Sequence, residues 1–173
     1  MENKKSSLLY GICGLAGIFF LTFLDQWTKH LAVLHLKNQE SIVWIPGVFQ
    51  LQYLENHGAA FGILQGQQWI FFLMTVFYLV AAVWIYLRIP KTKKYLPLHT
   101  IAVVLTAGAL GNFIDRISQG YVVDFFYFSL IDFPIFNVAD IYVVLSFIAL
   151  AICILFVYKD EDFAFLSLKK KEK

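Results

Sequence analysis

The sequence is short of charged residues, and this shortage excludes most soluble proteins. Charged residues make up 15% of the 173 residues and hydrophobic residues 60%, against roughly 45–50% hydrophobic residues in a typical soluble domain. There is too little polar sequence to cover a soluble globule and too much apolar sequence for a disordered chain. The net charge of +2 lacks the strongly basic balance of nucleic-acid-binding proteins, so we expect no nucleic-acid partner.

Cysteine is also scarce, which argues against a disulfide framework or a zinc site. Cys13 and Cys153 each lie within an apolar run, and we expect both to be small buried hydrophobic residues. No paired-ligand spacing such as His-Glu-x-x-His joins the four histidines, so a metallopeptidase is disfavoured. We therefore predict no metal and no cofactor.

What the sequence has in abundance is long uncharged runs. Each is long enough to cross a hydrocarbon core that about 20 helical residues span, the first by including flanking residues. Asp25-Gln26-Trp27-Thr28-Lys29 follows the first run in place of a small-residue cleavage site, so we interpret this run as a retained helix. The sequence predicts an all-α membrane protein, one integral domain over residues 1–173, with spans at about 8–27, 68–87, 96–115 and 139–158.

The basic residues predict the orientation of these spans. Two precede the first span, four lie between the second and third, and five follow the fourth, which places eleven of the fourteen on one side. Cytoplasmic loops carry the excess of lysine and arginine. We therefore expect both termini in the cytoplasm and the connections of residues 28–68 and 115–137 on the outer face.

The first outer connection carries strand signals. Residues 42–45 are β-prone, Pro46-Gly47 is a turn signal, and residues 49–53 alternate apolar and polar side chains. We expect a small extracytoplasmic β-sheet or hairpin within a β-rich connection at about residues 38–67. The following segment, 56–62, is rich in small residues that allow close backbone approach, and a simple turn back to the second span would explain it equally well.

Polar residues gather at the outer ends of the third and fourth spans. Asn112, Asp115 and Arg116 stand at i, i+3 and i+4 and are expected on one helical face. We interpret Asp115 with Arg116 as a charge pair that holds the helix end. Asn137 and Asp140 have N-cap spacing, so Asp140 is also explained by the positive end of the fourth helix.

Asp124 has no such structural explanation, because it lies in the apolar run 122–126, where an unpaired carboxylate is strongly disfavoured. Two carboxylates close together near apolar surface share one proton, since both cannot ionise easily. One can then activate water while the other hydrogen-bonds a carbonyl oxygen. A membrane carrier or ion-binding protein could also use Asp25, Asp115, Asp124 and Asp140, but no acid lies near the middle of a span, where transport sites lie.

Five short segments resemble, in order, the signature blocks of the lipoprotein signal peptidases, also called signal peptidase II. They are residues 25–29, 56–62, 108–116, 122–125 and 136–140. The resemblance implies a bacterial membrane aspartyl peptidase that removes the signal peptide from diacylglyceryl-modified prolipoproteins by cutting before the lipidated cysteine. Diacylated prolipoprotein and membrane lipid would be its partners, and its active site would lie near the extracytoplasmic face of the cytoplasmic membrane.

The resemblance assigns the catalytic pair to Asp124 and Asp140. It assigns supporting or substrate-binding roles to Asp25, Lys29, Asn56, Gly58, Asn112, Asp115, Arg116, Asn137 and Ala139. Because Asp140 is expected in the first turn of a helix, whose positive end favours a carboxylate, we expect the shared proton on Asp124 and the role of base on Asp140.

Overall fold

The computed structural model of the chain describes residues 4–58 and 66–167. Within them, four helices are long and apolar enough to cross a membrane, and a small antiparallel sheet accompanies them, which confirms the predicted fold class. The helices are α1 (Lys4–Leu36), α2 (Gln68–Arg88), α3 (Leu96–Gln119) and α4 (Val138–Ile152), the last extended by the π-helical turn η4 (Cys153–Val157). The strands are β1 (Ile42–Ile45), β2 (Phe49–Asn56) and β3 (Val122–Tyr127), and the 3₁₀ turns are η2 (Lys93–Tyr95), η3 (Ser129–Ile131) and η5 (Asp160–Leu166).

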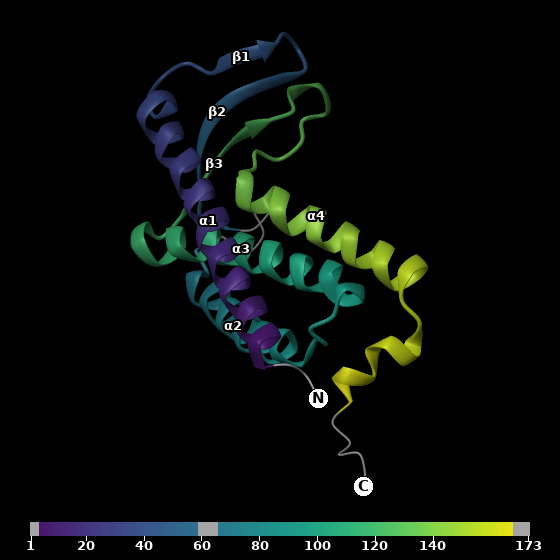
Figure 1. Cartoon of the computed structure of the whole chain (residues 1–173). Helices are drawn as coiled ribbons and strands as arrows, with labels where there is room; N and C mark the ends of the chain where they lie inside the picture. The colour runs from purple at the N-terminus through teal and green to yellow at the C-terminus, as the bar shows by residue number, and fades with distance from the viewer. Residues whose placement is uncertain (1–3, 59–65, 168–173) are drawn as a thin grey trace, which may run out of the picture.

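Helix α3 is the centre of the bundle and contacts α1, α2 and α4 (Figure 1). The middle of its buried surface is formed by small residues, which include Ala107, Gly108 and Gly111. A Cβ on Gly108 would lie 2.6 Å from the carbonyl oxygen of Ala139, so only glycine lets the two helices approach this closely. This close contact fixes the start of α4 against the outer half of α3.

Helix α1 is longer than the predicted span of residues 8–27 and runs on to Leu36. No glycine or proline interrupts its last ten residues, and the chain turns only near Asn38, which adopts a positive φ of 59°. The added turns support the sheet: Ala32 and Leu36 form a buried cluster with Val123 and Phe125. Helix α1 thus connects the bundle to the sheet at the upper end of Figure 1.

The sheet contains the predicted hairpin and a third strand that was not predicted. Strand β2 pairs antiparallel with β1 on one side and with β3 on the other, where Asn56 lies opposite Val122. The residues of β3 do not alternate apolar and polar side chains, because its first four residues are buried on both faces. The third strand carries Asp124, one of the two predicted catalytic acids.

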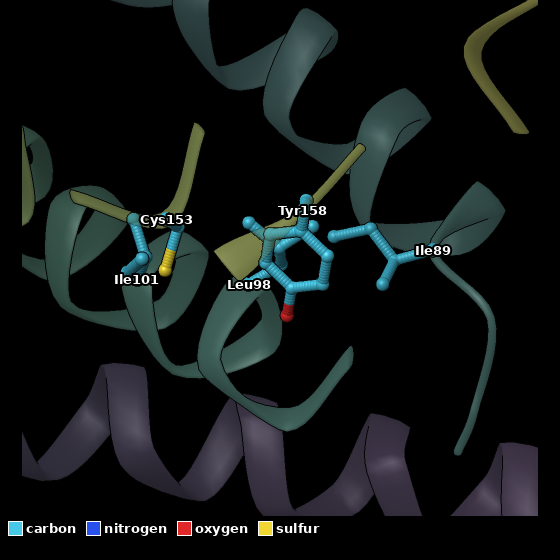
Figure 2. Close-up of a cluster of buried hydrophobic side chains, with 5 residues drawn as sticks. All are labelled: Ile89, Leu98, Ile101, Cys153 and Tyr158. Carbon is cyan, nitrogen blue, oxygen red and sulfur yellow. The ribbon is translucent and has the colours of Figure 1, made fainter. Parts of the chain in front are cut away.

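The end of the bundle opposite the sheet is closed by an apolar cluster from α2, α3 and the end of α4. Figure 2 shows Tyr158 lying over Leu98, between Ile89 on one side and Ile101 with Cys153 on the other. Cys153 is buried, as predicted, whereas Cys13 is exposed on α1 and that prediction is wrong. Hydrocarbon surrounds a membrane helix, so apolar residues such as Cys13 are not driven into the bundle.

Candidate active site

Asp124 and Asp140 line the same cavity, at the junction of the bundle and the sheet. The cavity has a volume of about 480 Å³ and is bordered by β3, the outer end of α3 and the first turns of α4. Most of its wall is apolar, and Asn56, Asn112 and Arg116 are its other polar residues. The two carboxylates predicted to act together are therefore brought to one mainly apolar space from positions 16 residues apart in the sequence.

Asp124 is almost fully buried, with 1% of its surface exposed, and two amide groups hold it. Asn56 donates from Nδ2 to Oδ2 at 2.8 Å, and Asn137 donates from Nδ2 to Oδ1 at 2.6 Å. Burial, and after it the negative charge of nearby Asp140, raise the pKa of Asp124 to about 7, although the two amides oppose the shift. Asp124 can therefore keep a proton near neutral pH.

Asp140 occupies the first turn of α4, in the predicted N-cap arrangement. The Asn137 side chain accepts the backbone N–H of Asp140 at 3.0 Å, and Asp140 Oδ2 accepts the backbone N–H of Asn137 at 3.1 Å. This reciprocal capping box fixes the side chain of Asp140 at the helix end. Its other oxygen, Oδ1, accepts a hydrogen bond from Asn112 Nδ2 at 2.8 Å and borders the cavity.

Asn112 links the two acids to a lysine on α1. Its Oδ1 accepts from Lys29 Nζ at 2.9 Å and from Asn137 Nδ2 at 3.1 Å. An ammonium group can only donate hydrogen bonds, so Lys29 forces the oxygen of the Asn112 amide toward itself and the NH₂ group toward Asp140. Lys29 thereby orients the group that holds one of the two carboxylates.

Behind Asn112 lies a buried ion cluster that joins three helices. Lys29 Nζ is 3.0 Å from Asp25 Oδ2 and 3.0 Å from Asp115 Oδ2, and all three side chains are at most 5% exposed. The other oxygen of Asp25 accepts the backbone N–H of Ala139 at 2.8 Å. The cluster thus fixes the first turn of α4, and with it Asp140, to α1 and α3.

The expected pairing of Asp115 with Arg116 is wrong. Asp115 Oδ2 contacts Lys29 and also accepts the backbone N–H of Val123 at 3.1 Å, which ties β3 to α3. Arg116 points to the other side and donates to the carbonyl oxygens of Gly58 at 3.1 Å and Asn112 at 3.4 Å. Consecutive residues of a helix do not face each other, so one turns toward α1 and the other toward the cavity.

Gln26 is a site residue that the sequence did not single out. Its Nε2 donates to Asp115 Oδ1 at 2.8 Å and to the carbonyl oxygen of Gly111 at 3.1 Å. The amide adds a neutral donor to a cluster of two acids and one lysine. A polar side chain next to Asp25, at the edge of an apolar run, was the available signal for this role.

The predicted site residues fall into three groups. The first group donates hydrogen bonds to Asp124 or Asp140 and consists of Asn56, Asn112 and Asn137. The second forms the buried ion cluster and its contact with α4 and consists of Asp25, Lys29, Asp115 and Ala139. The third is the pair Arg116 and Gly58, in which Arg116 donates to the Gly58 carbonyl oxygen. Residues 59–62 of the second block lie outside the described residues. Within residues 4–58 and 66–167, no three His, Cys, Asp or Glu side chains are placed to share a metal ion.

Comparison with known proteins identifies the family. The family model described as Signal peptidase (SPase) II matches residues 17–156. A lipoprotein signal peptidase of Streptococcus thermophilus is 43% identical over 145 residues, which cover 84% of this chain and 92% of that protein. One from Streptococcus pyogenes is 39% identical over 146 residues, covering 84% of this chain and 93% of that protein.

Solved structures agree with this match. A bacterial membrane enzyme determined by the in meso method at 2.3 Å resolution superposes with a TM-score of 0.74 and 33% identity, covering 92% of this chain and 94% of the other. A second, determined by the same method at 1.9 Å resolution, gives a TM-score of 0.71 and 34% identity over 84% of this chain and 94% of the other. With the four membrane-capable helices, these matches show a bacterial membrane protease, and the chain belongs to the signal peptidase II family.

Proposed function

We propose that this protein is an aspartic endopeptidase that removes the signal peptide from diacylated prolipoproteins, with Asp124 and Asp140 as the catalytic pair. The observation that carries the proposal is the shared cavity. One of its carboxylates has its pKa raised to about 7, and the other is held at a helix N-terminus by two N–H donors. A pair with such different surroundings can supply one acid and one base at neutral pH.

The reaction then needs only one water molecule and the two side chains. The water oxygen bonds to the scissile carbonyl carbon while Asp140 takes a water proton and Asp124 gives its proton to the carbonyl oxygen. The tetrahedral diol collapses, the carbon–nitrogen bond breaks, Asp140 protonates the leaving nitrogen and Asp124 recovers a hydroxyl proton. The leaving nitrogen belongs to the lipidated cysteine, which becomes the new N-terminus.

The substrate class follows from the walls of the cavity and from the relatives. Relatives named lipoprotein signal peptidase support a prolipoprotein substrate. The apolar lining, which includes Ile135, Phe136 and Val144, suits the acyl chains of a diacylated cysteine. The cation distribution supports cytoplasmic termini and, with them, a position of the pair near the outer face of the bacterial cytoplasmic membrane.

The decisive experiment is incubation of the purified protein, in detergent or lipid, with a diacylated prolipoprotein and its unlipidated form. We expect release of the signal peptide from the lipidated form only. Asp124→Asn and Asp140→Asn should each lower kcat by about 10²–10⁴-fold, since an amide can neither give nor take the proton.

Asp132→Asn is the matched control. Asp132 is an exposed acid outside the cavity that hydrogen-bonds Tyr127, and its substitution should leave turnover unchanged. Substantial turnover by either dyad variant rules out the assignment. A chelator that abolishes cleavage, with recovery on adding a divalent metal, rules out a metal-free pair.

A further inference from the structure

The sheet and the loop that follows it are almost free of charge, although they lie at one end of the helical bundle. No charged residue occurs in residues 41–54, which include β1, the hairpin turn and most of β2, and Asp132 is the only one in residues 125–137. Trp44 on β1 is 65% exposed, and Leu130 and Ile131 in η3 are 67% and 69% exposed. A domain surrounded by water rarely exposes a large apolar patch, so this surface is expected to have a partner.

The hairpin turn contacts the loop, so these exposed residues lie at one edge of the molecule. The backbone N–H of Leu130 donates to the carbonyl oxygen of Val48, in the turn between β1 and β2, at 3.4 Å. In Figure 1 the hairpin leaves the upper end of α1 and extends sideways to the loop before α4, rather than continuing along α1. We call the exposed residues Trp44, Ile45, Leu130 and Ile131 the sheet rim.

One face of the sheet is polar toward the free end of the hairpin. Asp124 and Phe126 stand two residues apart on β3 and lie on one face, whereas Tyr127 lies on the other, where Gln50 is its cross-strand partner. The Tyr127 hydroxyl donates to Asp132 at 2.6 Å. The only charge of the loop is therefore held at the face that carries the glutamine.

The opposite face, which carries the catalytic acid of β3, is covered by aromatic rings. The centroid of the Phe49 ring lies 6.1 Å from that of Phe126 and 4.9 Å from that of Phe128. Phe128 stacks on Phe136 at 5.9 Å, and Phe136 lines the catalytic cavity. At the other end of the series, the Trp44 ring lies 5.9 Å from Phe49. The aromatic face thus leads from the cavity to the sheet rim.

The charges at this end of the molecule lie on the side of α1. Lys37 forms an ion pair with Glu55, which lies opposite Val123 on the face that packs against α1. On the aromatic side, the cavity wall includes Val144 and Leu145, which are exposed on the membrane-capable helix α4. The aromatic face therefore adjoins the lipid-facing surface of a transmembrane helix, and the charged groups are turned away from it.

We propose that the sheet rim inserts into the phospholipid leaflet at this end of the bundle, which is the outer leaflet in the orientation proposed above. The aromatic face is turned toward the acyl chains and the glutamine face toward water. Tryptophan favours this interface, and amphipathic helices in the interface bury their apolar side by about 5–10 Å, so we expect Trp44 at a similar depth. A protein partner fits less well, because protein interfaces surround their apolar centre with polar groups.

Insertion of the rim has a consequence for the cavity. Residues 133–136 line the cavity and directly follow the rim residues of η3. The leaflet therefore holds one wall of the cavity at the boundary between headgroups and acyl chains, where the lipid of a diacylated cysteine also lies. Only this consequence rests on the proposed function, because insertion of the rim requires no substrate.

The test measures the depth of single tryptophans in phosphatidylcholine bilayers. Trp44 becomes the only tryptophan when the other three, all exposed, are replaced with phenylalanine: Trp27, Trp69 and Trp84. Lipid brominated near the ester end of its acyl chains should remove most of the Trp44 emission. Acrylamide dissolved in the water should quench Trp44 at least about threefold less than it quenches the control, because acrylamide does not reach the buried depth.

The matched control is Gln50→Trp in a chain whose four natural tryptophans are all phenylalanine. Gln50 belongs to the same hairpin but lies on the polar face. Brominated lipid should leave the emission of this variant nearly unchanged, and acrylamide should quench it.

A second pair of variants changes the charge of each face while Trp44 reports the depth. Leu130→Glu/Ile131→Glu adds two carboxylates to the rim and should abolish most of the quenching by lipid. Gln50→Glu/Gln52→Glu adds two to the polar face and should leave the quenching unchanged. Circular dichroism shows whether each variant is folded; if the rim variant is not, the comparison of Trp44 with Gln50→Trp decides alone.

Strong quenching of Trp44 by acrylamide, with no effect of brominated lipid, would overturn the insertion and leave a water-facing surface for a protein partner. Equal quenching by brominated lipid at both positions would also overturn it, since the sheet would then turn no particular face to the membrane. A protein that shows the expected depths but cleaves no prolipoprotein would keep the insertion and lose the proposed function.

Discussion

Replacing Lys29 with methionine removes the only cation of the buried ion cluster while keeping the apolar stem of the side chain. Lys29 Nζ is 3.0 Å from Asp25 and 3.0 Å from Asp115, and the three side chains are at most 5% exposed. The variant leaves two buried carboxylates without a counter-charge. Breaking a buried ion pair in this way typically costs about 3–5 kcal/mol, so we expect the free energy of unfolding to fall by about that amount.

Lys37→Met is the matched control from the same part of the chain. Lys37 forms an ion pair of 2.8 Å with Glu55, shorter than either contact of Lys29, but the two side chains are 39% and 32% exposed. Water and salt screen exposed charges, and holding two long side chains together costs entropy. We therefore expect almost no change in the free energy of unfolding, although the shorter distance between the charged atoms would by itself suggest a stronger ion pair than those of Lys29.

The assay is unfolding by titration of sodium dodecyl sulfate into mixed micelles, followed by circular dichroism, with turnover measured on the same samples. Lys29→Met should also lower kcat, because the Asn112 amide loses the contact that directs its NH₂ group toward Asp140. A loss below about 1 kcal/mol, as for an exposed pair, would refute the reasoning that burial makes this cluster strong.

Two further predictions concern Asp124 and Gly111. Turnover should fall as the pH rises through about 7, because Asp124 then loses its proton. The folded pKa of Asp124 lies above the usual value of 3.8, so the folded state should also lose stability as the pH rises from about 4 to about 7. Asp124→Asn should remove this loss when unfolding is measured at pH 5 and pH 8. Gly111→Ala should destabilise the protein by about 1–3 kcal/mol, because the added Cβ would lie 2.3 Å from Asp25 Oδ2. Gly11→Ala is the control: its Cβ meets no atom within 4 Å, so it should be neutral or slightly stabilising in the same titration. Equal effects of the two substitutions would contradict the close approach of α3 to α1.

The helices could be predicted from the sequence because each span must be apolar along its whole length, and a single lysine or aspartate ends such a run. The β1–β2 hairpin could be predicted from its turn and its alternating side chains. Strand β3 could not, because burial on both faces removes the alternation by which a half-buried strand is recognised. Its location next to Asn56 depends on pairing between segments 66 residues apart.

The candidate site was predictable in its residue types but not in its contacts. Lys29 and Asp115 form an ion pair but lie far apart in the sequence, so local spacing could not predict it. The spacing suggested instead that Asp115 pairs with its neighbour Arg116. The same limit hid Gln26, because two of its partners, Gly111 and Asp115, lie on another helix. Spacing within a helix indicates which residues share a face, but only the packing of helices decides what that face meets.

The contact between Asp25 and the backbone N–H of Ala139 has a consequence for the biosynthesis of this protein. It joins the first transmembrane helix to the last across 114 residues of sequence. A nascent chain is made and folded from its N-terminus, so Asp124 is synthesised before α4 and its Asp140. The proposed catalytic pair is therefore incomplete until the last transmembrane helix has been made and has packed against α1.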